Sequence, residues 1–177
     1  MRKVSIIGII AAFCFTSCNS GPSLQKYFVE KTEDKNFIAL DLSPSILNVD
    51  KSKLTVEQAE ALASFDKMNI LAFKRDSSNV ALYETEKAKV TEILKNKKYQ
   101  QLMKFGSGKT GAMVSFVGDE EHIDEFVLYA NQKESGFAVI RILGKDMNPT
   151  GIVTMMSVLK SANIDFEQLK PLQEMIK

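Results

Sequence analysis

The residues best suited to metal chemistry lie in one short acidic stretch. Asp119, Glu121 and His122 belong to the run 119–125, which holds the only histidine of the chain. Carboxylates beside an imidazole can bind a divalent cation. The run lacks the alternating ligands and the glycine turn of a calcium loop, and a charged, solvated hairpin tip explains it as well. These three residues are weak metal candidates, and we expect neither a metal nor a cofactor.

A second stretch, Gly106-Ser107-Gly108-Lys109-Thr110, has part of the sequence of a phosphate-binding loop. The complete pattern needs a glycine five residues before Gly108, where Met103 stands. It also needs a helix after the loop, so that the helix N-terminus meets the phosphate. The residues after Thr110 read as a strand instead. We therefore expect a hairpin loop and no nucleotide.

Other catalytic patterns are weak. No serine stands in a Gly-x-Ser-x-Gly elbow, and a single histidine on a charged loop makes a catalytic triad hard to build. The neighbouring carboxylates Glu120/Glu121 and Asp124/Glu125 leave a carboxylate-dependent hydrolase as an alternative. We expect a protein that is not an enzyme.

The residue with the clearest chemical fate is Cys18. Arg2 and Lys3 precede an apolar run over 6–13, which is too short to span a bilayer as a helix. Charge followed by an apolar run is typical of an export signal. The run ends in Phe15-Thr16-Ser17-Cys18, which resembles a bacterial lipobox. Such a cysteine receives acyl chains such as palmitate, and the peptide is cut just before it.

This interpretation divides the chain into three parts. Residues 1–17 are a lipoprotein signal peptide, 18–23 a linker after the lipidated Cys18, and 24–177 a single domain. The alternative is a plain signal peptide with an incidental cysteine. Cys14 would be removed with the signal, so the mature chain would have no disulfide and the fold must depend on its core.

Composition excludes one class of partner. The chain has 23 basic and 22 acidic residues, and removal of Arg2 and Lys3 leaves 21 against 22. A nucleic-acid-binding protein needs a basic surface, so we expect no nucleic acid partner.

Hydrophobic periodicity predicts helices and strands in a mixed order. Helices are expected over 23–33, from the Thr55–Gln58 capping box to about 65, over 79–96, and from Pro149 onward. Strands are expected over 36–42, 67–74, 99–105, 112–117, 123–131 and 137–143. Short glycine-bearing connections between the last four strands indicate antiparallel hairpins. The fold class is therefore α+β, a two-layer sandwich of a mostly antiparallel sheet with helices packed on it.

Side-chain positions follow from the same patterns. The second helix should bury Val56, Ala59 and Leu62, and the fourth should bury Ile152, Met155, Met156 and Leu159. In the third helix, Glu84, Glu86, Lys87 and Lys89 should face water. Asp41 and Arg141 interrupt apolar strands, and they could pair if those strands are neighbours; otherwise each points to solvent. Several strands are apolar on both faces, so helices cover both sides or one face meets a partner or ligand.

The order of lipobox, short helix and the strands Phe37–Leu42 and Phe137–Gly144 resembles the small Bacteroidota lipoproteins grouped as domain of unknown function 4252 (DUF4252). The resemblance implies an envelope location and brings no activity and no catalytic residues. Surface-exported lipoproteins of that group carry acidic residues soon after the cysteine, and residues 19–23 have none. This favours a periplasm-facing anchor in the inner or outer membrane.

We therefore expect a lipid-anchored cell-envelope protein whose partners are the membrane, through Cys18, and a protein or apolar ligand at the sheet face. The first hypothesis is a non-enzymatic binding or interaction module. The alternatives are a carboxylate-dependent envelope hydrolase and a regulatory partner of an envelope signalling system.

Overall fold

The computed structural model describes residues 21–47, 49–107 and 109–154. Within these ranges the helices and 3-10 turns are α1 (Leu24–Lys31), η1 (Pro44–Leu47), η2 (Lys51–Lys53), α2 (Val56–Ala63), α3 (Val80–Leu94) and a helix over 149–154. The strands are β1 (Phe37–Leu42), β2 (Phe65–Lys74), β3 (Gln100–Ser107), β4 (Thr110–Gly118), β5 (Ile123–Gln132) and β6 (Gly136–Met147). Among the described residues, no helix has the length and apolar character needed to cross a membrane.

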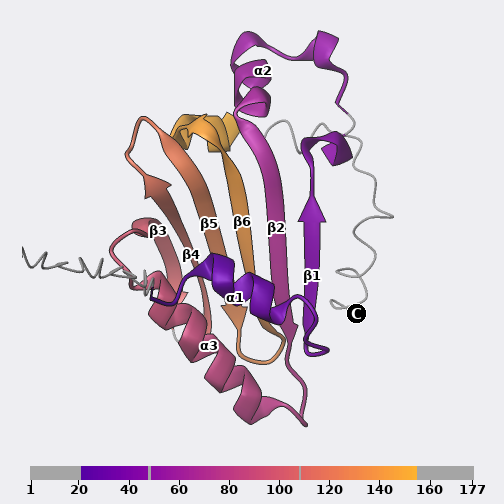
Figure 1. Cartoon of the computed structure of the whole chain (residues 1–177), viewed down its shortest axis with the longest axis vertical. Coiled ribbons are helices and arrows are strands. Elements are labelled where there is room, and N and C mark those ends of the chain that lie inside the picture. Colours follow the sequence, from indigo (N-terminus) through magenta and orange to yellow (C-terminus); the bar gives the residue numbers. More distant parts are fainter. Residues whose placement is uncertain (1–20, 48, 108, 155–177) are drawn as a thin grey trace, which may run out of the picture.

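The six strands form one antiparallel sheet in the order β1-β2-β6-β5-β4-β3 (Figure 1). The last four strands are consecutive hairpins, as the glycine-bearing connections predict. The β1–β2 pair joins this meander through β6 rather than through β3. The α+β fold class predicted from the sequence is confirmed.

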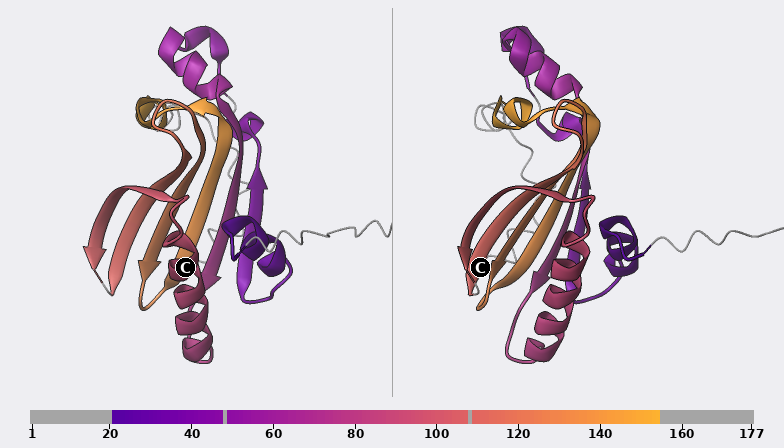
Figure 2. Two further views of the ribbon diagram at one scale, coloured as in Figure 1. Left: turned by 60° about the vertical axis from the view of Figure 1, so that its left-hand side comes forward. Right: turned by 90° about the vertical axis from the view of Figure 1, so that its left-hand side faces the viewer.

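Helices α1 and α3 lie on the same side of the sheet (Figure 2). Their apolar residues and one face of the strands form the main core, which includes the fully buried Leu24, Phe73, Tyr83 and Val90. Aromatic rings dominate this core; Phe73 and Phe137, for example, are stacked with centroids 5.6 Å apart. A core of this kind supplies large buried apolar areas without any disulfide.

Helix α2 begins where the sequence predicts, at a capping box. The Thr55 hydroxyl accepts from the Gln58 amide at 3.2 Å, and the Gln58 side chain accepts from the Thr55 amide at 3.0 Å. The predicted buried face of this helix is wrong in part. Val56 is 70% exposed and Ala59 is also exposed, whereas Leu62 is half-buried.

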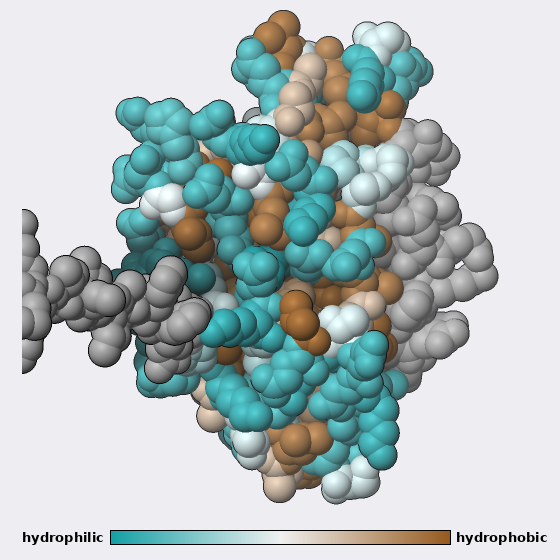
Figure 3. Space-filling model, viewed as in Figure 1, coloured by the Kyte–Doolittle hydropathy of each residue, from teal (hydrophilic) through white to brown (hydrophobic). Residues whose placement is uncertain are grey.

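The reason for this difference is the position of α2. The helix projects beyond the end of the sheet, so only its C-terminal part meets the strands (Figure 1). Apolar residues consequently gather on the surface over α2, at the top of Figure 3. An exposed apolar surface of this kind often marks an interaction site.

The predicted helix after Asn148 is confirmed over residues 149–154, with Pro149 at its first position. Ile152 is half-buried and packs against the cluster of Phe116, Ile123 and Phe126. The other members of its predicted stripe, Met155, Met156 and Leu159, lie outside the described residues.

Candidate functional site

The side of the sheet under α1 and α3 buries two polar contacts whose roles are structural. One joins β5 and β6: Arg141 donates from Nε to Glu125 Oε1 at 2.6 Å and from Nη2 to Oε2 at 3.2 Å. Both residues are buried, and the Phe28 ring of α1 lies 5.4 Å from Arg141 Cζ. The Arg141 guanidinium is thus paired with Glu125 and packed under the Phe28 ring, as a buried charge requires.

The hypothesis that Asp41 pairs with Arg141 is wrong, because β2 lies between β1 and β6. The residue opposite both of them is Asn69 of β2. The Asn69 amide donates to Asp41, and Arg141 takes Glu125 on its other neighbouring strand. Sequence alone does not show the strand order on which this choice depends.

The second buried polar contact joins α1 to α3 and overturns the prediction that Glu86 faces water. Glu86 is only 2% exposed. Tyr27 donates its hydroxyl to Glu86 Oε2 at 2.8 Å, and Lys31 and Lys89 approach Oε1 at 3.2 and 2.9 Å. Burial raises the pKa of Glu86, but the bonds from Lys89, Tyr27 and Lys31 outweigh it and hold the pKa below its usual value.

The second face of the sheet, turned away from α1 and α3, is apolar and has a regular surface. One cross-strand row consists of large residues: Leu40, Ile70, Ile140, Leu128, Val114 and Met103. The next row has alanine on four adjacent strands between two large ends: Ile38, Ala72, Ala138, Ala130, Ala112 and Phe105. On β6, β5 and β4 the alanines of the second row leave a shallow trough, whereas Ala72 on β2 is only 2% exposed.

This trough opens at β3, an edge strand of the sheet. Met103 and Phe105 at its end are 43% and 58% exposed. A hollow of about 530 Å³ adjoins Phe105, Ala112, Ala130 and Ala138. Among the described residues, no strand pairs with the outer edge of β3. Exposed apolar side chains on a free edge form a surface that another chain can extend.

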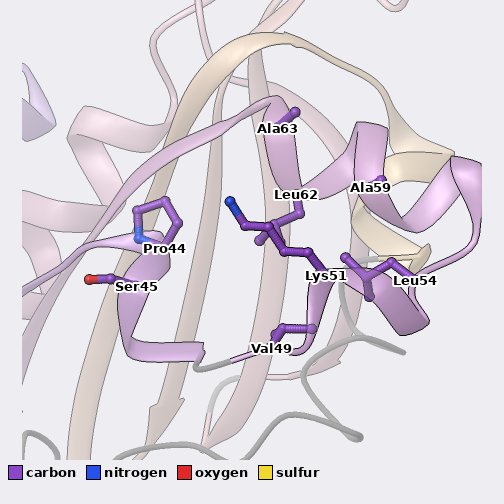
Figure 4. Close-up of a pocket in the computed structure, with 8 residues that line it drawn as sticks. All are labelled: Pro44, Ser45, Val49, Lys51, Leu54, Ala59, Leu62 and Ala63. Atoms are coloured by element: carbon purple, nitrogen blue, oxygen red, sulfur yellow. The ribbon is translucent and has the colours of Figure 1, made fainter.

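A separate cavity of about 410 Å³ lies between the 3-10 turns and α2 (Figure 4). The described residues that line it are Pro44, Ser45, Val49, Lys51, Leu54, Ala59, Leu62 and Ala63. Lys51 is the only charged residue among them, and its side chain extends between Pro44 and Leu62 (Figure 4). The apolar floor packs against Leu42, Phe65 and Ile70 of the sheet.

The three weak metal candidates lie in the exposed turn between β4 and β5. Asp119 Oδ1 accepts from the amides of Glu121 and His122 at 3.1 and 2.8 Å and lies 3.3 Å from His122 Nδ1. These backbone hydrogen bonds, that from His122 first, lower the pKa of Asp119. In the part of the chain that the structure describes, no group of three or more metal-ligating side chains comes together. The arrangement matches a solvated hairpin turn.

The phosphate-loop-like stretch joins β3 to β4, and a strand follows it, as expected for a hairpin. Gly106 has φ +70°, a backbone conformation that favours glycine. Cys18, the predicted lipidation site, lies outside the described residues.

Sequence reasoning missed both the trough and the cavity. The four alanines stand in four different strands, so they form a row only once the strand order and register are known. Lys51 stands among other lysines in the sequence, and only the fold shows that it borders the cavity between the 3-10 turns and α2. A usable signal was that several strands are apolar on both faces, which indicated a second apolar face without showing where it is exposed.

Comparison with known proteins gives one match. The family described as "Domain of unknown function (DUF4252)" matches residues 27–155. No curated protein and no solved structure matches the chain significantly.

Proposed function

Since the chain belongs to the DUF4252 family, whose description assigns no activity, we propose its function from its surface: a lipid-anchored, non-catalytic binding module of the cell envelope. Its partner is a protein that covers the second face of the sheet at the open corner of β3. The observation that carries the proposal is the exposure of Met103 and Phe105 at the end of the alanine trough.

A protein fits this corner better than a small molecule for a geometric reason. The trough is shallow, and its floor runs across several strands to a free edge. An extended segment of a partner can pair with the backbone of β3 and cover Met103 and Phe105 with its own apolar side chains. Small ligands bind instead in concave sites that enclose most of their surface.

The anchor completes the proposal. An acyl chain on Cys18 would hold the domain at the periplasmic side of the inner or outer membrane, where its partners would also be envelope proteins. A regulatory role in an envelope signalling system is one form that this binding function can take.

The test is capture of envelope proteins by the lipidated full-length chain and by the double variant Met103→Ser, Phe105→Ser. We expect the wild-type chain to retain a specific partner and the variant to lose it, because two serines remove the exposed apolar area. The control is Val29→Ser, which changes an apolar residue on α1 that is even more exposed, at 75%. Equal capture by wild type and the double variant would refute the proposal.

A further inference from the structure

The cavity between η1, η2 and α2 has a composition that differs from the trough. Apolar side chains of Val49, Leu54 and Leu62 form its floor, and among the described lining residues Lys51 supplies the one ammonium group. Its volume of about 410 Å³ lies within the roughly 300–1,000 Å³ of small-molecule sites. An apolar site with one polar group at its border suits a ligand that has an apolar chain and one polar head group.

Lys51 is free to meet such a ligand. Within the described ranges it has no carboxylate within ion-pair distance, whereas Lys53 on the same turn pairs with Asp50 at 3.3 Å. No acidic side chain is among the described lining residues. Among the described lining residues, the positive charge of Lys51 is therefore the only charge, and it favours a negative charge on the ligand.

We propose that this cavity binds a small amphiphilic carboxylate, with its acyl chain among Val49, Leu54 and Leu62 and its carboxylate at Lys51. Transfer of methylene groups out of water drives the binding, and the ammonium group selects an anionic head over a neutral or cationic one. This site is separate from the β3 corner, so it adds a small-molecule ligand to the proposed protein-binding function.

The test uses the full chain with Cys18→Ala, so that no attached acyl chain competes, and decanoate as the probe. We expect saturable changes in the methyl NMR signals of Val49, Leu54 and Leu62. Decanol and decyltrimethylammonium share the decyl chain but lack the negative charge. Each should bind at least about tenfold more weakly than decanoate. Changes confined to other methyl groups, or equal binding of decanoate and decanol, would overturn the proposal.

Two variants locate the head and the chain. Lys51→Met should weaken decanoate binding about tenfold and leave decanol binding unchanged, because it removes only the charge. Its matched control, Lys53→Met, should leave both unchanged. Ala59→Phe, at an exposed position of α2, should fill the cavity and abolish both. Ala63→Phe repeats this test from a second lining position if Ala59→Phe unfolds the chain.

A Lys51→Met chain that binds decanoate as tightly as the wild type would refute the role of the ammonium. Decanoate binding that survives both phenylalanine variants in folded protein would refute the cavity itself. Neither result bears on capture at Met103 and Phe105, so this inference and the proposed function can fail independently.

Discussion

Glu86 shows why residue type alone misplaces a side chain. It stands three residues after Tyr83 and four before Val90, so it lies on the buried stripe of α3 rather than on the opposite face. Its charge suggested that the Glu86 side chain faces water. The structure instead provides a hydroxyl and two ammonium groups, two of these three partners coming from α1. The position of Glu86 in the helical repeat fixes where its side chain points. The partners from α1 offset the cost of burying its charge.

We expect Glu86→Ala to lower the free energy of unfolding by about 3 kcal/mol, because Tyr27 would remain buried without its acceptor and Lys31 would lose its most buried carboxylate, keeping Glu30 and Asp34. Urea unfolding at neutral pH measures the change. Glu84→Ala, which changes an exposed acid on the same helix, should alter the free energy of unfolding by no more than about 0.5 kcal/mol. A similar loss in both variants would contradict a special role for Glu86.

The pH dependence gives a second signature of the same contact. The folded pKa of Glu86 lies below its usual value of 4.5. Its stabilising contribution is therefore complete above the unfolded pKa and is lost as the pH falls through the folded pKa. Glu86→Gln should accordingly lose less stability than the wild type on acidification. An identical pH profile for the two chains would show that the carboxylate charge does not contribute.

At the scale of elements, the β5–β6 hairpin depends on one backbone conformation. Gly136 has φ +128°, and a Cβ atom there would collide with the Phe73 carbonyl oxygen of β2. We expect Gly136→Ala to cost about 3 kcal/mol or more in urea unfolding, because strain and collision add. Gly151→Ala is the matched control: its Cβ would have ordinary contacts within the helix over 149–154, and stability should stay equal or rise by up to about 1 kcal/mol.

The sequence predicts the elements well because each has a local cause. The Thr55–Gln58 capping box starts α2, Pro149 starts the last described helix, and glycine-bearing turns join β3 to β6. Strand order has no such local cause. The contact of β2 with β6 joins residues far apart in the chain, and it separates Asp41 from Arg141. The same long-range pairing aligns the four alanines, so the candidate site could not be located from the sequence.

At the scale of the whole molecule, α1 at the N-terminal end of the described domain is fixed to the rest of the fold by several contacts. The amide of Leu24, the first residue of α1, donates to the Tyr99 hydroxyl at 3.1 Å, and α1 is further fixed by Glu86 and by the Phe28–Arg141 contact. A linker over 18–23 would span at most roughly 20 Å. An acyl chain on Cys18 would therefore keep α1 close to a membrane while the second face of the sheet stays turned away from that helix.

If the proposed lipid anchor is correct, localisation depends on Cys18. We expect the wild-type chain to incorporate labelled palmitate and to have a mature N-terminus at Cys18. Cys18→Ala should abolish both, because the thiol that receives the acyl chain is gone. Cys14→Ala removes the other cysteine, which lies within the predicted signal peptide, and should leave both unchanged. A processed Cys18→Ala protein that still partitions with membranes would contradict lipid anchoring, whereas labelling lost equally in the two variants would assign the effect to the leader rather than to Cys18.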